Sequence, residues 1–202
     1  RLFGIRLSDN FNSPYFAHSI ADFWRRWHIS LTSWFRDYVY IPLGGNRKGK
    51  WQTIINTLIV FSLCGLWHGA NWTFVVWGLY NAMLFVPMIL LRTNKHRDAS
   101  SERLKWLKVI ITFVFVVLGW ILFRAPSMTE CWGYIQALCR LDFSSIWIEN
   151  IFQMACVIVA IIIMFVFEWR KYLPNRWWVY YILLFSIWWF AGQDVDFIYF
   201  QF

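Results

Sequence analysis

Two histidines in this sequence lie in surroundings where an ionisable side chain indicates a candidate functional site. His68 lies in the stretch CGLWHGANW, between two long apolar runs, and Gly65 and Gly69 flank it closely. An ionisable group in such surroundings is a functional-site hypothesis by default. A neutral imidazole can take the proton of an attacking hydroxyl, which is the chemistry of a general base. The two glycines would leave room for a substrate beside the ring. The alternative is a histidine that bonds the backbone of a neighbouring helix.

His28 lies in the stretch FWRRWHIS, directly after Arg25 and Arg26. Paired arginines in an otherwise apolar protein suit the binding of phosphate or carboxylate groups. We expect Asp22 and Asp37 to pair with these arginines, since Asp22 and Arg26 are four residues apart on a predicted helix. The alternative is a juxtamembrane cluster whose long side chains reach the membrane surface. That alternative accounts for the arginines better than for His28.

Other kinds of site are not indicated by the sequence. It has no HxxxH or HExxH spacing and no carboxylate cluster, so no metal site is predicted. It has no GxSxG elbow and no Walker loop, and the stretch LGGNRKGK lacks the GK[ST] ending of a phosphate loop. The net charge is +8, but the basic residues lie mainly in the loops between apolar runs, as membrane topology requires. Nucleic acid is therefore not an expected partner.

The composition predicts an integral membrane protein that contacts membrane lipid. Hydrophobic residues make up 59% and aromatic residues 22% of the 202 residues, against about 45–50% apolar residues in soluble domains. We therefore predict an all-α, polytopic protein with interfacial or re-entrant helices. The expected apolar helices cover residues 52–66, 72–91, 104–123, 150–167 and 177–191.

The remaining segments complete one predicted membrane domain over residues 1–202. Residues 14–40 carry many charges among aromatics, which favours helices at the interface or lining a polar interior, beginning at Ser13 and Pro14. Residues 127–140 form a predicted amphipathic interfacial helix. The candidate catalytic motifs thus occupy 14–91, further transmembrane helices 104–191, and a tail 192–202. Because the chain begins with Arg1, we expect it to be the C-terminal portion of a longer protein.

The distribution of lysine and arginine predicts the orientation. If the first two apolar runs cross the membrane and return to the face from which they started, three segments lie on the same side, namely 44–50, 92–108 and 168–176. Together these segments carry twelve lysine and arginine residues. The segment 124–149 and the tail carry only Arg124 and Arg140. The positive-inside rule then makes the first side cytoplasmic.

Three stretches resemble the membrane-bound O-acyltransferase family, in particular its bacterial alginate O-acetylation branch. They are FWRRWHISLTSWFRDYVYIPLGGNRKG, NTLIVFSLCGLWHGANWTFVVWGLY and the closing FIYFQF. The resemblance runs from about Phe11 to Leu91 and resumes at the C-terminus. It implies the core of that family's helical fold, without the family's N-terminal helices. One departure is Asn81, where relatives often carry a histidine after the tyrosine.

The resemblance also implies an activity and a site. His68 would be the catalytic residue and His28 the second polar residue, and the two would meet in a tunnel through the bacterial inner membrane. Acetyl-CoA would be the cytoplasmic donor, with no bound cofactor. The acetyl group would pass to a hydroxyl of an extracytoplasmic polysaccharide, alginate or a similar exopolysaccharide, through a periplasmic acetyltransferase partner. We expect substrate- and donor-binding groups around the two histidines, namely Arg25, Arg26, Trp27, Trp67, Asn71 and Asp37.

Other activities remain open from the sequence. One is the transfer of D-alanyl or another acyl group to a cell-wall polymer. Another is transport, with the histidines as proton relays, although paired Gly/Pro-broken segments repeated in two halves are missing. A third is a non-enzymatic scaffold subunit.

Overall fold

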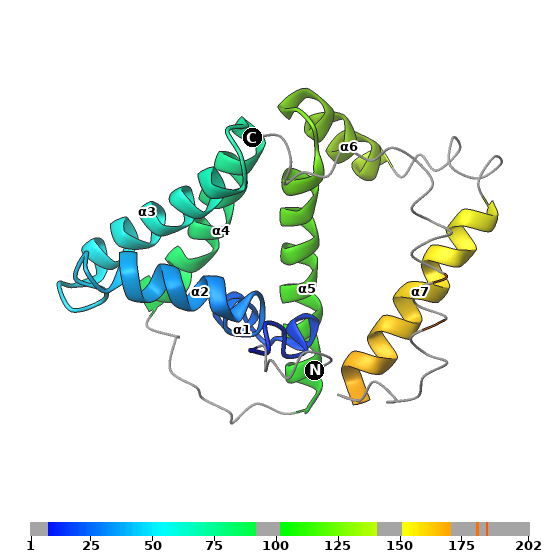
Figure 1. Cartoon of the computed structure of the whole chain (residues 1–202), viewed down its shortest axis with the longest axis horizontal. Coiled ribbons are helices and arrows are strands. Elements are labelled where there is room, and N and C mark those ends of the chain that lie inside the picture. The colour runs from blue at the N-terminus through cyan, green and yellow to red at the C-terminus, as the bar shows by residue number, and fades with distance from the viewer. Residues whose placement is uncertain (1–7, 92–101, 141–150, 171–180, 182–184, 186–202) are drawn as a thin grey trace. The chain divides into compact units, whose positions relative to one another are not determined.

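The computed structural model describes residues 8–91, 102–140 and 151–170, together with Tyr181 and Phe185 (Figure 1). Throughout these residues the regular structure is helical, which confirms the all-α prediction. Two compact units divide the chain, residues 1–147 and residues 148–202. The first unit holds every candidate site residue. The prediction of one domain over 1–202 stays a prediction.

The helical hairpin around His68 is formed by α3 (Lys50–His68) and α4 (Trp72–Leu91). The two helices lie side by side (Figure 1) and are antiparallel, because Lys50 Nζ at the start of α3 donates to the carbonyl of Leu90 at the end of α4, at 2.7 Å. Their bounds agree with the predicted apolar runs 52–66 and 72–91.

Glycines let these two helices approach closely. A Cβ atom on Gly65 would collide with the carbonyl oxygen of Phe74, and one on Gly78 would collide with that of Phe61. Each glycine therefore allows one helix backbone to touch the other. The interpretation of Gly65 as clearing space for a substrate is wrong, since Gly65 is buried against the backbone of α4.

The segment before the hairpin is a series of short helices. They are a 3₁₀ turn, Pro14–Phe16, then α1 (Ile20–Arg26), α2 (Ile29–Phe35) and a π-helical turn, Arg36–Tyr40. Pro14 opens the first turn as predicted. Ser19 caps the N-terminus of α1, where its Oγ accepts a hydrogen bond from the backbone N–H of Asp22 at 3.2 Å. Helices were expected over 14–40, but the break at His28 was not.

The glycine-rich loop between the π-helical turn and α3 is held by a buried amide. Asn56 on α3 is fully buried, and its Nδ2 donates to the carbonyls of Gly45 at 2.9 Å and Leu43 at 3.4 Å. Gly44 and Gly45 have positive φ angles of 103° and 57°, which bring these carbonyls toward α3. The buried amide of Asn56 thus fixes the loop that precedes the hairpin.

Asn56→Leu keeps the side-chain size but removes both hydrogen bonds to the loop, together with the one that Asn56 Oδ1 accepts from Gln52 Nε2 at 2.9 Å. Because buried acceptors without donors cost about 1–3 kcal/mol, we expect a lower midpoint of thermal unfolding in detergent. Ile55→Leu, at the neighbouring position that is 48% exposed, is the matched control and should unfold like the wild type. Equal unfolding midpoints for Asn56→Leu and the wild type would contradict the anchoring role.

The remaining helices are α5 (Glu102–Arg124), α6 (Met128–Arg140) and α7 (Ile151–Arg170). Their bounds agree with the predicted segments 104–123, 127–140 and 150–167. Among the described residues, two helices are long and apolar enough to cross a membrane, over 72–90 and 103–124. The predicted span 177–191 and the tail 192–202 lie outside the described residues, apart from Tyr181 and Phe185.

Candidate active site

The imidazole of His68 sits in a box of aromatic rings at the C-terminal end of α3. Ring centroids lie 4.8 Å away for Trp67, 4.9 Å for Phe123, 5.5 Å for Trp77 and 6.2 Å for Phe74. These rings come from α3, α4 and α5, so three helices position the imidazole. The box leaves the imidazole half-buried, within reach of a substrate.

Gly69 ends α3 and makes room for this box. Its φ of 156° lies at the edge of the region that favours glycine, and a Cβ atom there would come within 2.8 Å of Phe74 Cε2. The glycine on this side of His68 therefore serves the packing of Phe74 around the imidazole, which the expectation of an open substrate space did not foresee.

His28 lies at the break between α1 and α2. This residue has a φ of 43°, in the left-handed region that costs a non-glycine residue energy. Its Nδ1 is buried and has no hydrogen-bond partner among the described residues. Backbone strain together with an unsatisfied ring nitrogen is a combination found at functional sites.

A short N-terminal segment holds this strained turn from both sides. The backbone N–H of Asn12 donates to the carbonyl of Arg26 at 2.9 Å, and the carbonyl of Asn10 accepts from the N–H of Ile29 at 3.0 Å. Asn10 Oδ1 also accepts from the backbone N–H of Ser30 at 2.9 Å. Sequence reasoning missed this clamp, since residues 8–13 showed only irregular polar character.

The structure brings the two histidines into one neighbourhood. Their imidazoles are close enough to interact electrostatically. The ring of Trp27, next to His28, lies 4.9 Å from Trp120, and Trp120 lies 5.8 Å from Phe123, which packs on His68. A continuous aromatic cluster thus joins two polar groups that are far apart in the sequence.

Asp22 organises the arginines beside His28. Arg26 Nε lies 3.1 Å and Arg25 Nη2 lies 3.5 Å from Asp22 Oδ1, and the backbone N–H of His18 donates to Oδ2 at 3.2 Å. Burial alone would raise the pKa of Asp22, but the hydrogen bonds from Arg26 and His18 and the two positive charges outweigh it and hold that pKa below its ordinary value. The carboxylate is therefore charged and fixes α1 next to the turn at His28.

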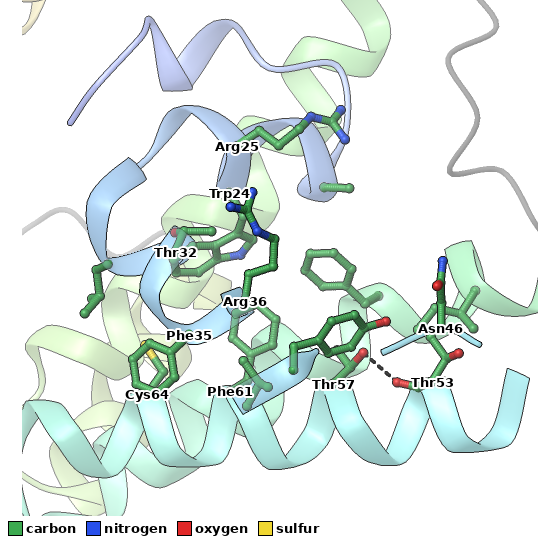
Figure 2. A pocket seen from close by; sticks show the side chains of 16 residues that line it. Trp24, Arg25, Thr32, Phe35, Arg36, Asn46, Thr53, Thr57, Phe61 and Cys64 are labelled. Atoms are coloured by element: carbon green, nitrogen blue, oxygen red, sulfur yellow. Dashed lines mark hydrogen bonds between the residues drawn. The ribbon is translucent and has the colours of Figure 1, made fainter. Parts of the chain in front are cut away.

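A cavity of about 410 Å³ opens between α1, α2, the π-helical turn, α3 and α4. Its lining is mainly apolar, and Figure 2 shows Arg25 and Arg36 on one side of it, opposite Thr53 and Thr57 on α3. Apolar walls with a few charged groups are typical of a small-molecule site. Other lining residues include Trp24, Leu31, Phe35, Phe61 and Phe85.

The cavity ends close to His68. Cys64, which lines it, is one helical turn before His68 on α3, and residues four apart share a helix face. Trp24, which also lines it, packs 5.8 Å from Trp77, and Trp77 packs 5.5 Å from His68. The wall of the cavity thus reaches, through Cys64 and Trp24, the side chains that surround the imidazole.

The other expected site residues have defined places. Trp67 is 49% exposed and covers one edge of His68. Asn71 Nδ2 donates to the carbonyl of Pro126 at 2.9 Å, and its Oδ1 accepts from the N–H of Thr73 at 3.1 Å, so its amide ties the hairpin turn to the start of α6. Asp37 forms an exposed pair with Arg36 at 2.7 Å. The expected pairing of aspartate with Arg25 and Arg26 is therefore correct for Asp22 and wrong for Asp37.

The fold is that of an all-helical membrane protein, and its candidate site is a pair of histidines joined by an aromatic cluster. A family model for the membrane-bound O-acyltransferase family, MBOAT, matches residues 2–129. Because this match covers more than half of the 202 residues, the chain belongs to that family.

Three relatives illustrate the range of the similarity. A probable alginate O-acetylase from Pseudomonas aeruginosa is 45% identical over 68% of this chain and 26% of its own length. A peptidoglycan O-acetyltransferase from Helicobacter pylori is 42% identical over 69% and 26%. A teichoic acid D-alanyltransferase from Bacillus subtilis is 36% identical over 60% and 33%. The chain thus spans about a quarter to a third of the length of these relatives.

Proposed function

We propose that the whole protein is a multi-pass O-acyltransferase of the bacterial inner membrane. It would move an acetyl group from cytoplasmic acetyl-CoA to a hydroxyl of an extracytoplasmic polysaccharide. The observation that carries the proposal is the aromatic cluster that joins Trp27, next to His28, to the rings around His68, beside a cavity that reaches Cys64 one helical turn from His68. Family membership and the printed names of the relatives support acyl transfer to a polymer.

The reaction would use His68 as the general base. The imidazole takes the proton of the acceptor hydroxyl while its oxygen attacks the thioester carbonyl. The resulting tetrahedral intermediate collapses, the carbon–sulfur bond breaks, and the CoA thiolate leaves with the proton from His68. An ester and free CoA are the products. His28 would orient the reacting groups from the opposite side of the cluster.

The cavity would hold the acyl donor. Its apolar walls suit the pantetheine arm of acetyl-CoA. Arg25 and Arg36, which pair with Asp22 and Asp37 in this structure, would turn toward the phosphates when the donor binds. The basic segments 44–50 and 92–108 support a cytoplasmic entrance, because lysine and arginine favour that side. No bound cofactor takes part in this scheme.

The cavity assignment predicts a selective effect on donor binding. Val60→Trp places a large ring in the cavity, so we expect the KM for acetyl-CoA to rise at least tenfold, which corresponds to about 1.4 kcal/mol of binding, while kcat changes less. Ile59→Trp, on the 37% exposed neighbouring position, is the control and should keep the wild-type KM. An unchanged KM in Val60→Trp would contradict donor binding in this cavity.

The acceptor side would involve a polymer and a partner. The name of a relative supports a polysaccharide such as alginate. A periplasmic acetyltransferase would be the partner that receives the acetyl group. The similarity to a teichoic acid D-alanyltransferase supports a second candidate, the transfer of D-alanyl groups to a cell-wall polymer.

Mass analysis of the surface polymers separates these candidates. Cells that carry or lack the full-length protein are compared for the groups released by mild base. Loss of acetate upon deletion supports the first proposal, and loss of D-alanine with normal acetate supports the second. Unchanged acetate and D-alanine would contradict both.

A further inference from the structure

The cluster between the two histidines contains a hydrogen-bond donor with no acceptor. Trp120, on α5, lies with its ring 4.9 Å from Trp27 on one side. On the other side its ring lies 5.8 Å from Phe123 and 6.4 Å from Trp77, both of which pack against His68. Trp120 therefore stands between the surroundings of His28 and those of His68.

The indole nitrogen of Trp120 is buried without a hydrogen-bond partner in the part of the chain that the structure describes. An indole N–H can only donate, so its partner must be an acceptor. Leaving a buried donor unsatisfied costs about 1–3 kcal/mol. A phenylalanine would keep an aromatic ring at this position without that cost, so the N–H is a donor that an acceptor on a bound substrate would satisfy.

The donors around the reacting centre are few. Asn71 was expected among the substrate-binding groups, but its amide is engaged with Pro126 and Thr73 at 2.9 and 3.1 Å. Among the described residues, the buried side-chain atoms without partners are Nε1 of Trp24 and Trp120, Nδ1 of His28 and Oγ1 of Thr73. Of the two indoles, that of Trp120 packs directly on Trp27, beside His28, and on Phe123, which contacts His68. Acyl transfer needs such a donor where the carbonyl oxygen becomes negatively charged.

We propose that the indole N–H of Trp120 donates a hydrogen bond to the carbonyl oxygen of the acyl donor as that oxygen becomes an oxyanion. This inference rests on the proposed function and adds one residue to its site. Attack of the hydroxyl moves the carbonyl π electrons onto the oxygen, where Trp120 stabilises them. When the carbonyl re-forms, the thiolate leaves with the proton that His68 took. Trp120 keeps its own proton throughout.

Trp120→Phe in the full-length protein tests the proposal, because an aromatic ring remains, although a smaller one, while the N–H is lost. With membranes and radiolabelled acetyl-CoA we expect kcat to fall about 10²–10³-fold, the usual effect of removing one oxyanion donor, with little change in KM. Trp106→Phe is the matched control on the same helix, since Trp106 packs on Phe16 outside the cluster and is 43% exposed. It should keep the wild-type kcat.

A pair of inhibitors separates a hydrogen bond from a packing effect. A ketone analogue of acetyl-CoA, in which a methylene replaces the sulfur, keeps the carbonyl, whereas S-ethyl-CoA lacks it. Trp120→Phe should weaken inhibition by the ketone and leave inhibition by S-ethyl-CoA unchanged. Equal weakening of both inhibitors, or a kcat within threefold of the wild type, would overturn the inference. Acetyl transfer that survives in His68→Ala would instead overturn the proposed function, whatever Trp120→Phe does.

Discussion

His68→Ala should reduce acetyl transfer to the polysaccharide by about 10²–10⁴-fold, the typical contribution of a general base. The imidazole lies at the centre of its aromatic box, 4.9 Å from Phe123 and 5.5 Å from Trp77, and the variant leaves these rings in place. The acceptor hydroxyl then has no group to take its proton. The measurement is the amount of ester-linked acetate on the surface polysaccharide of cells that carry the full-length variant.

The control for this prediction is another histidine of the same chain. His18 is 47% exposed on its side chain and lies 3.7 Å from Asp22, away from the aromatic box. His18→Ala should therefore give wild-type acetate at equal protein levels in the membrane. Normal acetate in His68→Ala would show that His68 is not the base.

His28→Ala should reduce acetyl transfer by about 10²–10³-fold, the range expected when one preorganised polar group is lost from the reacting centre. The Nδ1 of His28 is buried and unsatisfied among the described residues, so it is available to a substrate. The residue is also held at a φ of 43°. The measurement is the rate of label transfer from acetyl-CoA by membranes at equal protein content.

His28→Asn separates the chemical role from the strained backbone. Asparagine tolerates the left-handed region and keeps a polar side chain, so we expect it to recover part of the activity lost in His28→Ala. Because both histidines act in one cluster, the double variant with His68→Ala should be no less active than His68→Ala alone. Equal loss in the alanine and asparagine variants, with reduced protein in the membrane, would indicate a structural role only.

Much of the helical framework could be predicted from the sequence. The apolar runs determine the extents of α3, α4 and α5, because each run is long, is bounded by polar or glycine-rich segments and has a single plausible structure. The amphipathic pattern of residues 127–140 likewise predicts α6. The pair Asp22–Arg26 was predictable because both residues belong to one short helix.

Features that depend on contacts between distant segments could not be predicted. The left-handed turn at His28 depends on the hydrogen bonds that Asn10 accepts and Asn12 donates, which no local pattern indicates. The role of Gly65 depends on how closely α4 approaches α3. The position of Trp120 depends on how α5 packs against Trp27. A tryptophan in an apolar run gives no sign that its N–H will be buried without an acceptor.

The most direct test of the proposed mechanism is acetyl transfer by membrane vesicles that contain the full-length protein and its acceptor polymer. Radiolabelled acetyl-CoA is supplied on the cytoplasmic side, and labelled ester on the polymer is measured. We predict steady labelling with the wild type and none above background with His68→Gln, which keeps hydrogen bonding but cannot act as a base. Equal labelling by the wild type and His68→Gln would contradict acyl transfer at this histidine.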